Sequence, residues 1–124
     1  MMITDGYGMS EMSPVVCCQN EKDVDEEPES IGFLTPNARA RIVSPEGKDL
    51  ERGEEGELLL QGPQMMLGYI DSEAANTATF TSPRSDPDCW LRTGDTAKIS
   101  KAGRLTLTGR TKDMIKVSNH PRYV

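Results

Sequence analysis

The stretch DTAKISKAGRLTLTGR, residues 95–110, carries the clearest structural pattern in the chain. Its two halves, DTAKIS and RLTLTGR, alternate apolar and polar residues on either side of the turn Lys101-Ala102-Gly103. Such alternation is typical of half-buried strands, and a short glycine-containing connection between two alternating runs is typical of a β-hairpin. The stretch therefore predicts two antiparallel strands in a fold built mainly from β-structure.

Further elements are expected on the N-terminal side of this hairpin. Residues 31–50 (IGFLTPNARARIVSPEGKDL) alternate through 38–43 and then break at PEGK, which has the composition of a hairpin turn. Residues 57–62 (ELLLQG) form a short apolar strand. Residues 72–81 (SEAANTATFT) are the best helix candidate, because Ser72 or Asp71 can cap the start and Phe80 can pack one side.

Two polar segments are expected to be loops. The run QNEKDVDEEPES (19–30) is strongly acidic and contains a proline, which indicates a solvated surface loop, and TSPRSDPD (81–88) has a similar turn-rich composition. The sum is five to seven short strands and one short helix. We therefore predict a mainly β fold with a minor helical part, arranged as a small distorted β-barrel or as two sheets.

Composition excludes several classes of function. The 124 residues suit one modest domain, and the net charge of −6 gives no general attraction for nucleic acid or anionic membranes. Cys17, Cys18 and Cys89 lack CxxC spacing, so neither a disulfide framework nor a zinc site is expected. This cysteine usage favours a reducing, cytoplasmic location. His120 is the only histidine, which disfavours Ser-His-Asp catalysis. No apolar run has the length of a membrane span, and no signal peptide is recognised.

The N-terminal motif GYGMSE (6–11) concentrates groups that a nucleotide could use. Gly6 and Gly8 let a flat ligand approach the ring of Tyr7, Ser10 offers a hydroxyl to phosphate, and Glu11 offers an oxygen ligand of the kind Mg²⁺ prefers. A turn of this composition can equally be structural. The motif alone leaves both interpretations open.

Two later motifs add groups of the same kind. In RTGD (92–95), Asp95 follows a tight turn at an expected strand start and can accept both hydroxyls of a ribose. In GRTKDMIK (109–116), the cations Arg110, Lys112 and Lys116 can contact phosphate or ribose oxygens. Taken singly, Asp95 can also be a turn cap, and the three cations a solvated strand edge. Their occurrence in order favours the nucleotide interpretation.

The ordered set YGMSE, GELLLQGPQMMLGYIDSEAANTATF, WLRTGD and GRTKDMIK resembles the adenylate-forming (AMP-dependent synthetase/ligase) superfamily. The isoleucine before Lys116 is similar to the acyl-CoA synthetase and 4-coumarate-CoA ligase branch. The resemblance implies residues 1–108 as the last β-barrel subdomain of the large AMP-binding domain, residues 109–118 as a hinge to a C-terminal domain, and 119–124 as an unrelated tail.

The resemblance implies a role for each motif residue. Gly6 and Tyr7 would lie along the adenine, residues Gly6 to Gly8 would also lie near the acyl pocket, and Ser10 would touch the α-phosphate. Glu11 would hold Mg²⁺. Asp95 would bind the ribose hydroxyls, Arg110 would support ribose or phosphate, Lys112 would mark the hinge, and Lys116 would lie near the adenylate. The cofactors implied are ATP or AMP, Mg²⁺ and coenzyme A, with a small carboxylic acid as substrate.

The family's upstream phosphate loop and its C-terminal domain with the catalytic lysine are not found in these residues. We therefore expect a fragment of an ATP-dependent acyl-CoA ligase that retains part of the AMP site and is inactive alone, with a separate chain as one source of the missing parts. The alternatives are a non-catalytic binding or interaction module, or a truncated gene product with a vestigial nucleotide site.

Overall fold

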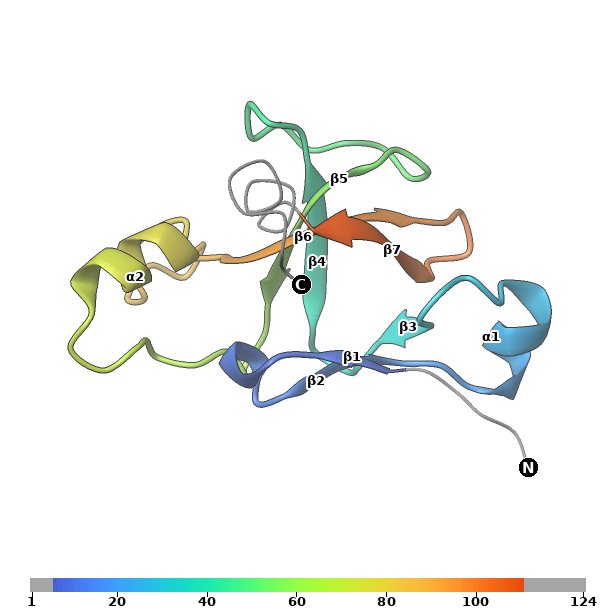
Figure 1. Ribbon diagram of the computed structural model, residues 1–124, viewed down its shortest axis with the longest axis horizontal. Coiled ribbons are helices and arrows are strands. Elements are labelled where there is room, and N and C mark those ends of the chain that lie inside the picture. The colour runs from blue at the N-terminus through green and yellow to red at the C-terminus, as the bar shows by residue number, and fades with distance from the viewer. Residues whose placement is uncertain (1–5, 111–124) are drawn as a thin grey trace, which may run out of the picture.

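A computed structural model of the chain describes residues 6–110 and arranges their seven strands as two antiparallel sheets (Figure 1). The first sheet has the order β1-β2-β3, and the second has the order β4-β5-β6-β7. The bounds are β1 (Gly6–Gly8), β2 (Val15–Cys18), β3 (Phe33–Leu34), β4 (Arg39–Val43), β5 (Gly56–Gln61), β6 (Leu91–Ile99) and β7 (Leu105–Arg110). The predicted β class is confirmed, and within the described residues the arrangement is two sheets rather than a closed barrel.

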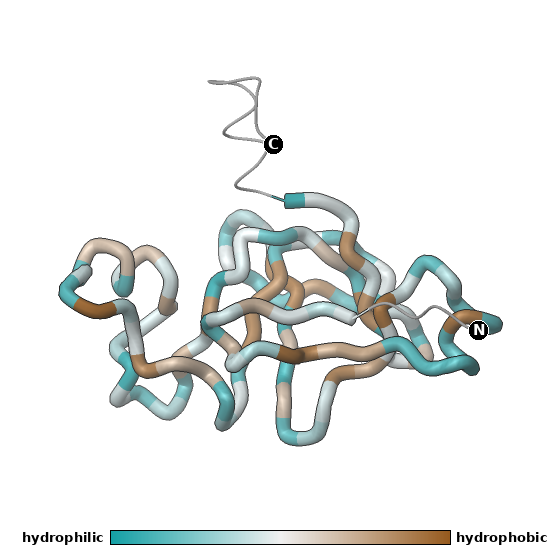
Figure 2. Tube along the Cα trace, turned by 60° about the horizontal axis from the view of Figure 1, so that its bottom comes forward, coloured by the Kyte–Doolittle hydropathy of each residue, from teal (hydrophilic) through white to brown (hydrophobic). Residues whose placement is uncertain are grey.

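The hydrophobic core contains residues from both sheets and from the segments that connect the strands. Many of the hydrophobic segments lie along the central strands, and most of the outer loops are hydrophilic (Figure 2). The buried core residues are Met12, Val16, Cys17, Ile42, Leu58, Leu60, Met65, Phe80, Cys89, Leu91, Ala97 and Leu105. Burial of this apolar surface is the main favourable term for the fold.

The continuous apolar run of β5 is explained by burial on both of its faces. Leu58 and Leu60 belong to the core, whereas Leu59 belongs to a second buried cluster with Val43 and Trp90. The guanidinium groups of Arg39 and Arg41 lie over the Trp90 ring at 5.3 and 5.2 Å from its centroid. The arginines of β4 therefore cover the outer cluster through cation–π contacts.

The two sheets are joined by main-chain hydrogen bonds. The amide of Ile31 donates to the carbonyl of Leu105 over 2.8 Å, and the amide of Leu105 donates to the carbonyl of Gly32 over 2.9 Å. The segment just before β3 is thus paired with the start of β7. This pairing ties the N-terminal sheet to the hairpin that carries the C-terminal part of the described chain.

The helix expected at residues 72–81 is α2 (Glu73–Thr79), which lies at one end of the molecule (Figure 1). Ser72 occupies the N-cap position, but its side chain makes no capping hydrogen bond. No residue of α2 is buried, and the helix is followed by the buried Phe80 at its C-cap. The buried Phe80 therefore anchors this end of the molecule.

The acidic segment 19–30 is not the solvated loop that the sequence predicted. It contains the helix α1 (Glu21–Glu26), which begins with a capping box between Asn20 and Asp23. The side chain of Asp23 is fully buried. The acidic composition suggested a solvent-exposed loop, but some of the carboxylates bind a cationic partner side chain that is distant in the sequence.

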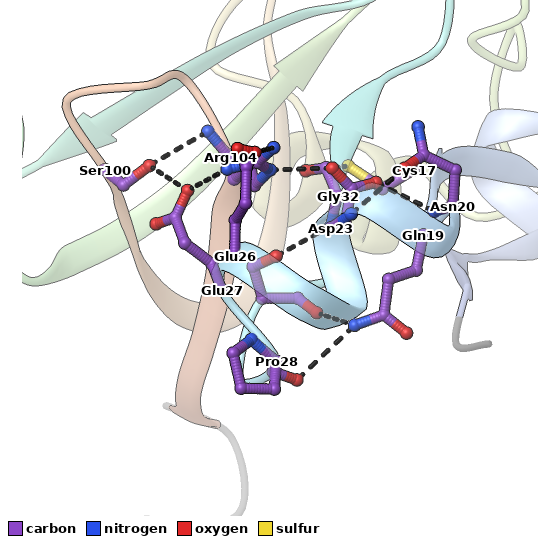
Figure 3. Close-up of polar contacts among 11 residues, drawn as sticks. Cys17, Gln19, Asn20, Asp23, Glu26, Glu27, Pro28, Gly32, Ser100 and Arg104 are labelled. Atoms are coloured by element: carbon purple, nitrogen blue, oxygen red, sulfur yellow. Dashed lines mark hydrogen bonds and ion pairs between the residues drawn. The ribbon is translucent and has the colours of Figure 1, made fainter. Parts of the chain in front are cut away.

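That partner is Arg104, which lies at the start of the β7 segment and is itself buried (Figure 3). Its guanidinium donates to Asp23 at 2.6 Å, to Glu27 at 2.6 Å and to Glu26 at 3.3 Å. The Ser100 hydroxyl also contacts Glu27, at 3.2 Å. We call Asp23, Glu26, Glu27 and Arg104 the Arg104 cluster. It fastens α1 to the end of the β6–β7 hairpin.

Contacts within the Arg104 cluster shift the pKa values of its members. The backbone amide of Asn20, together with Arg104, lowers the pKa of Asp23 against the opposing effect of burial. The hydrogen bond from Arg104 lowers the pKa of Glu27, and the carboxylates raise the pKa of Arg104. All of these shifts favour the charged forms.

A search of residues 6–110 for membrane spans found no helix with the length and apolar character that a crossing needs.

Candidate functional site

A cavity of about 530 Å³ lies between the N-terminal strand and the β6–β7 hairpin. Its lining residues are Tyr7, Gly8, Met9, Glu11, Thr93, Asp95, Leu107, Gly109 and Arg110. We call it the Tyr7–Asp95 cavity. Its volume falls within the range of small-molecule sites.

The cavity brings together polar groups from the two ends of the described chain. The hydroxyl of Tyr7 donates to Asp95 Oδ2 over 2.5 Å, although the two residues are 88 positions apart. The Nε of Arg110 lies 3.3 Å from Asp95 Oδ1. Both carboxylate oxygens of Asp95 are therefore engaged. Burial and the Asp95 hydrogen bond raise the pKa of Tyr7.

An irregularity within β6 directs Asp95 toward the cavity. The pairing of β5 with β6 shifts between Glu57 and Leu59, and Gly94 has the positive φ of 77° that glycine tolerates. The Thr93 hydroxyl donates to the carbonyl of Leu58 at 2.8 Å and accepts from the Asp95 amide at 3.0 Å. Asp95 thus lies at a bulge inside a long strand rather than at the strand start that the sequence predicted.

A second bulge places Arg110 opposite Asp95. Ala97 pairs with Leu107, but Thr96 pairs with Gly109, so Thr108 is an extra residue on β7. As a result Asp95 pairs with Arg110. If the same residues continued from the Ala97–Leu107 pair without a bulge, Gly109 would lie opposite Asp95, because each strand would advance by one position at a time. The cross-strand carboxylate–guanidinium pair depends on this bulge.

The close packing of the backbone requires a glycine at Gly8. A Cβ atom at this position would come within 2.0 Å of the carbonyl oxygen of Pro14. A Cβ atom at Gly6 would meet its nearest neighbour, the Cys17 carbonyl oxygen, at an ordinary 3.5 Å. The proximity of β1 to the turn before β2 thus explains one of the two glycines around Tyr7.

Glu11 is held by two contacts from the segment between β5 and α2. Its carboxylate Oε2 accepts a short hydrogen bond from the Tyr69 hydroxyl, and its carbonyl accepts from the amide of Met66 at 2.8 Å. Burial and this hydrogen bond raise the pKa of Tyr69. Tyr69 is a contact residue that the sequence analysis did not select for the site.

Of the nine predicted site residues, five line the cavity, two do not, and two lie outside the described residues. Tyr7, Gly8, Glu11, Asp95 and Arg110 meet there, whereas Gly6 and Ser10 are not among the lining residues. Lys112, Lys116 and the expected hinge from residue 111 onward lie outside the described residues. Sequence reasoning missed four lining residues, which are Met9, Thr93, Leu107 and Gly109. Thr93 could have been selected because it lies within the RTGD motif.

A second cavity, of about 560 Å³, lies beside α2 and contains none of the predicted site residues. Phe80, Pro83 and Arg84 are among its lining residues. It is therefore separate from the chemistry that the motifs indicate.

The Tyr7–Asp95 cavity combines an aromatic ring, a carboxylate that can accept from hydroxyl groups, a guanidinium and a second carboxylate. Residues 6–110 contain no group of three or more His, Cys, Asp or Glu side chains that could hold a metal ion. Glu11 could thus supply one ligand to a cation, with water and the phosphate oxygens of a bound molecule supplying the others, which is the usual arrangement for Mg²⁺.

Comparison with known proteins gives one family match and many relatives. The model of the family described as "AMP-binding enzyme" matches residues 1–70. The long-chain-fatty-acid–CoA ligase of Salmonella typhimurium is 37% identical over 121 residues, 98% of this chain and 20% of the relative. A probable 4-coumarate–CoA ligase of Dictyostelium discoideum is 38% identical over 117 residues, 94% of this chain and 20% of the relative. The chain spans about a fifth of the length of these curated relatives.

A solved structure agrees with the fold. The o-succinylbenzoate coenzyme A synthetase of Bacillus subtilis in complex with AMP has a TM-score of 0.77 and 27% identity, covering 89% of this chain and 27% of that one. The same synthetase was also solved in complex with ATP and a magnesium ion. The β architecture is thus shared with known structures.

Proposed function

Because the chain belongs to the AMP-binding enzyme family, we propose that it is a segment of an ATP-dependent acyl-CoA ligase and that the Tyr7–Asp95 cavity is the nucleoside-facing wall of its AMP site. The names of the relatives, which are fatty-acid and coumarate CoA ligases, support this branch of the family. The substrates are then a carboxylic acid, ATP and coenzyme A.

One observation carries the proposal. Tyr7, Asp95 and Arg110 come from opposite ends of the described chain, yet they form a connected hydrogen-bonded and ionic unit in one cavity. Motif residues with purely local structural roles have no reason to converge in this way. Their convergence is what a shared ligand site requires.

The residues then have distinct roles in binding. Gly6 and Tyr7 lie along the adenine, with Gly8 near the acyl pocket, and the Asp95 carboxylate accepts from the ribose hydroxyls in exchange for its present partners. Arg110 supports the ribose or the phosphate.

Glu11 fits a magnesium site in which phosphate oxygens complete the coordination, because its carboxylate lines the same cavity. When bound, the ion would neutralise phosphate charge. Ser10 lies next to Glu11 and is assigned to the α-phosphate.

The remaining assignments concern the parts outside the cavity. Lys112 belongs to a hinge at residues 109–118, and Lys116 lies near the adenylate. The other walls of the site belong to the rest of such a ligase, on the same polypeptide or on a separate chain. Cys17, Cys18 and Cys89 are all free, which supports a reducing compartment such as the cytoplasm.

The 124-residue chain alone is expected to show no measurable acyl-CoA synthesis. Adenylation depends on positioning and on stabilising charge around the phosphorus, and one wall of the site supplies only part of that stabilisation. The measurement is thioester formation from ATP, Mg²⁺, coenzyme A and a fatty acid or a cinnamate. Clear turnover by the purified chain would show that the site is more complete than we propose.

AMP binding by the chain is the direct test of the half-site. Isothermal calorimetry is expected to detect AMP binding by the wild-type chain, and Asp95→Asn is expected to weaken it about tenfold, because a hydrogen bond to a charged group is lost. Asp49→Asn is the matched control. Asp49 is an exposed carboxylate paired with Arg41 at 2.6 Å, and it does not line the cavity.

Two results would contradict the half-site. The first is the absence of any AMP-dependent heat, which would favour a vestigial nucleotide site. The second is an equal loss of affinity in the Asp95 and Asp49 variants, which would mean that the effect is general and not local to the cavity.

A further inference from the structure

We infer that Tyr69 is a positioning residue for the metal-binding carboxylate: its hydroxyl holds Glu11 Oε2 so that Oε1 is presented to a divalent cation. This inference rests on the proposed function, since Glu11 is the magnesium ligand of that proposal. It adds a residue from a different segment of the chain, 58 positions from Glu11.

Glu11 needs such support because its own element is weak. It lies in a single 3-10 turn, η1 (Ser10–Met12), whose N-cap residue makes no side-chain capping hydrogen bond. The side chain is half-buried and lines the cavity. A glutamate on such a short turn has several rotamers, and the Tyr69 hydroxyl selects one of them.

Tyr69 is suited to this task because its own backbone is fixed. Its amide donates to Asn76 Oδ1 at 2.7 Å, and Asn76 Nδ2 donates back to the Tyr69 carbonyl at 3.3 Å. Asn76 belongs to α2, so the tyrosine is anchored to a helix. The Met66 amide, three residues earlier, binds the carbonyl of Glu11. The segment therefore fixes both the main chain and the side chain of Glu11.

The contact leaves a free coordination position. Among residues 6–110, the only side-chain hydrogen bond of the Glu11 carboxylate is that from Tyr69 to Oε2. Oε1 remains for the cation. Groups that hold a metal ligand through hydrogen bonds typically change metal affinity by 10- to 100-fold when they are removed. Removal of the Tyr69 hydroxyl is therefore expected to affect metal binding more than nucleotide binding.

The experiment uses Mn²⁺ as the probe with the full 124-residue chain. Broadening of amide NMR signals around Glu11 locates the ion, and electron paramagnetic resonance gives its affinity, with and without AMP. Tyr69→Phe is expected to weaken Mn²⁺ binding about tenfold and to leave AMP affinity in EDTA within about twofold. Glu11→Gln is expected to abolish the broadening, and addition of Tyr69→Phe to it is expected to cause no further loss.

The outcomes separate this inference from the proposed function. Mn²⁺ broadening at Glu11 that is weakened by Tyr69→Phe supports the inference even in a chain that binds no AMP, and in that case only the proposed function fails. Equal Mn²⁺ affinity in wild type and Tyr69→Phe overturns the inference, as does broadening that is absent or located away from Glu11. Equal losses of Mn²⁺ and AMP affinity in Tyr69→Phe would indicate a general structural role and also overturn it.

Discussion

Replacement of Arg104 by methionine is expected to lower the Tm of the chain by about 10 °C or more. The change removes the guanidinium that binds three carboxylates, of which Asp23 is 1% exposed and Glu27 is 20% exposed. Breaking a buried ion pair by removing one partner is strongly destabilising, because a charge is left buried without compensation. Thermal unfolding followed by circular dichroism at pH 7 measures the effect.

Two further variants make this test specific. Arg92→Met removes a more exposed pair with Glu57 at 3.8 Å, and it is expected to change the Tm by no more than about 2 °C. The double variant Asp23→Asn/Arg104→Met is expected to recover part of the loss, because the most buried uncompensated charge is gone. A Tm for Arg104→Met equal to that of Arg92→Met would show that the Arg104 cluster does not stabilise the fold.

Acidification is expected to remove the contribution of the same cluster. The pKa values of Asp23 and Glu27 are lowered in the folded chain, so the unfolded chain binds more protons in the range between folded and unfolded pKa values. The stabilisation is complete above the unfolded pKa values of about 4 and is lost as the pH falls through the lowered folded values. The free energy of unfolding should therefore decrease steeply below about pH 4.

Urea unfolding across pH 3 to 7 measures this dependence. The variant Asp23→Asn/Glu27→Gln is expected to be less stable at pH 7 and to lose less stability on acidification than the wild type. The matched control is Glu21→Gln/Asp25→Asn, which changes two exposed carboxylates of the same helix. An unchanged acid dependence in Asp23→Asn/Glu27→Gln would assign the acid sensitivity to other carboxylates.

The elements that the sequence predicted well are those decided by neighbouring residues. The hairpin at residues 95–110 and the strand at ELLLQG are found as β6–β7 and β5, because alternation and apolar runs report local burial. Helix α1 was missed because its burial depends on Arg104, which lies 81 positions from Asp23. Within the segment itself only the spacing of Asn20 and Asp23 indicated a helix start.

In the candidate site, too, local features could be predicted from the sequence and long-range ones could not. Its motif residues could be selected from chemistry and resemblance, and the structure places Tyr7, Asp95 and Arg110 in one cavity. Alternation could not predict the bulges that aim Asp95 and Arg110, since an extra residue leaves a strand pattern almost unchanged. Tyr69 was missed for another reason. Its hydroxyl reaches Glu11 because the segment between β5 and α2 passes beside the N-terminal motif, and no local sequence pattern predicts that course.

The extra residue Thr108 gives the β6–β7 hairpin two ends that should respond differently to changes in length. At the tip, the turn at residues 101–103 is followed directly by Arg104, so loss or gain of one residue there would displace its guanidinium from the carboxylates of Asp23 and Glu27. At the other end, loss of Thr108 would make the pairing regular and would keep Gly109 opposite Thr96 and Arg110 opposite Asp95, whereas an inserted residue would move Arg110 out of register with Asp95. The hairpin should therefore tolerate loss of the bulge residue better than a change of length at its tip.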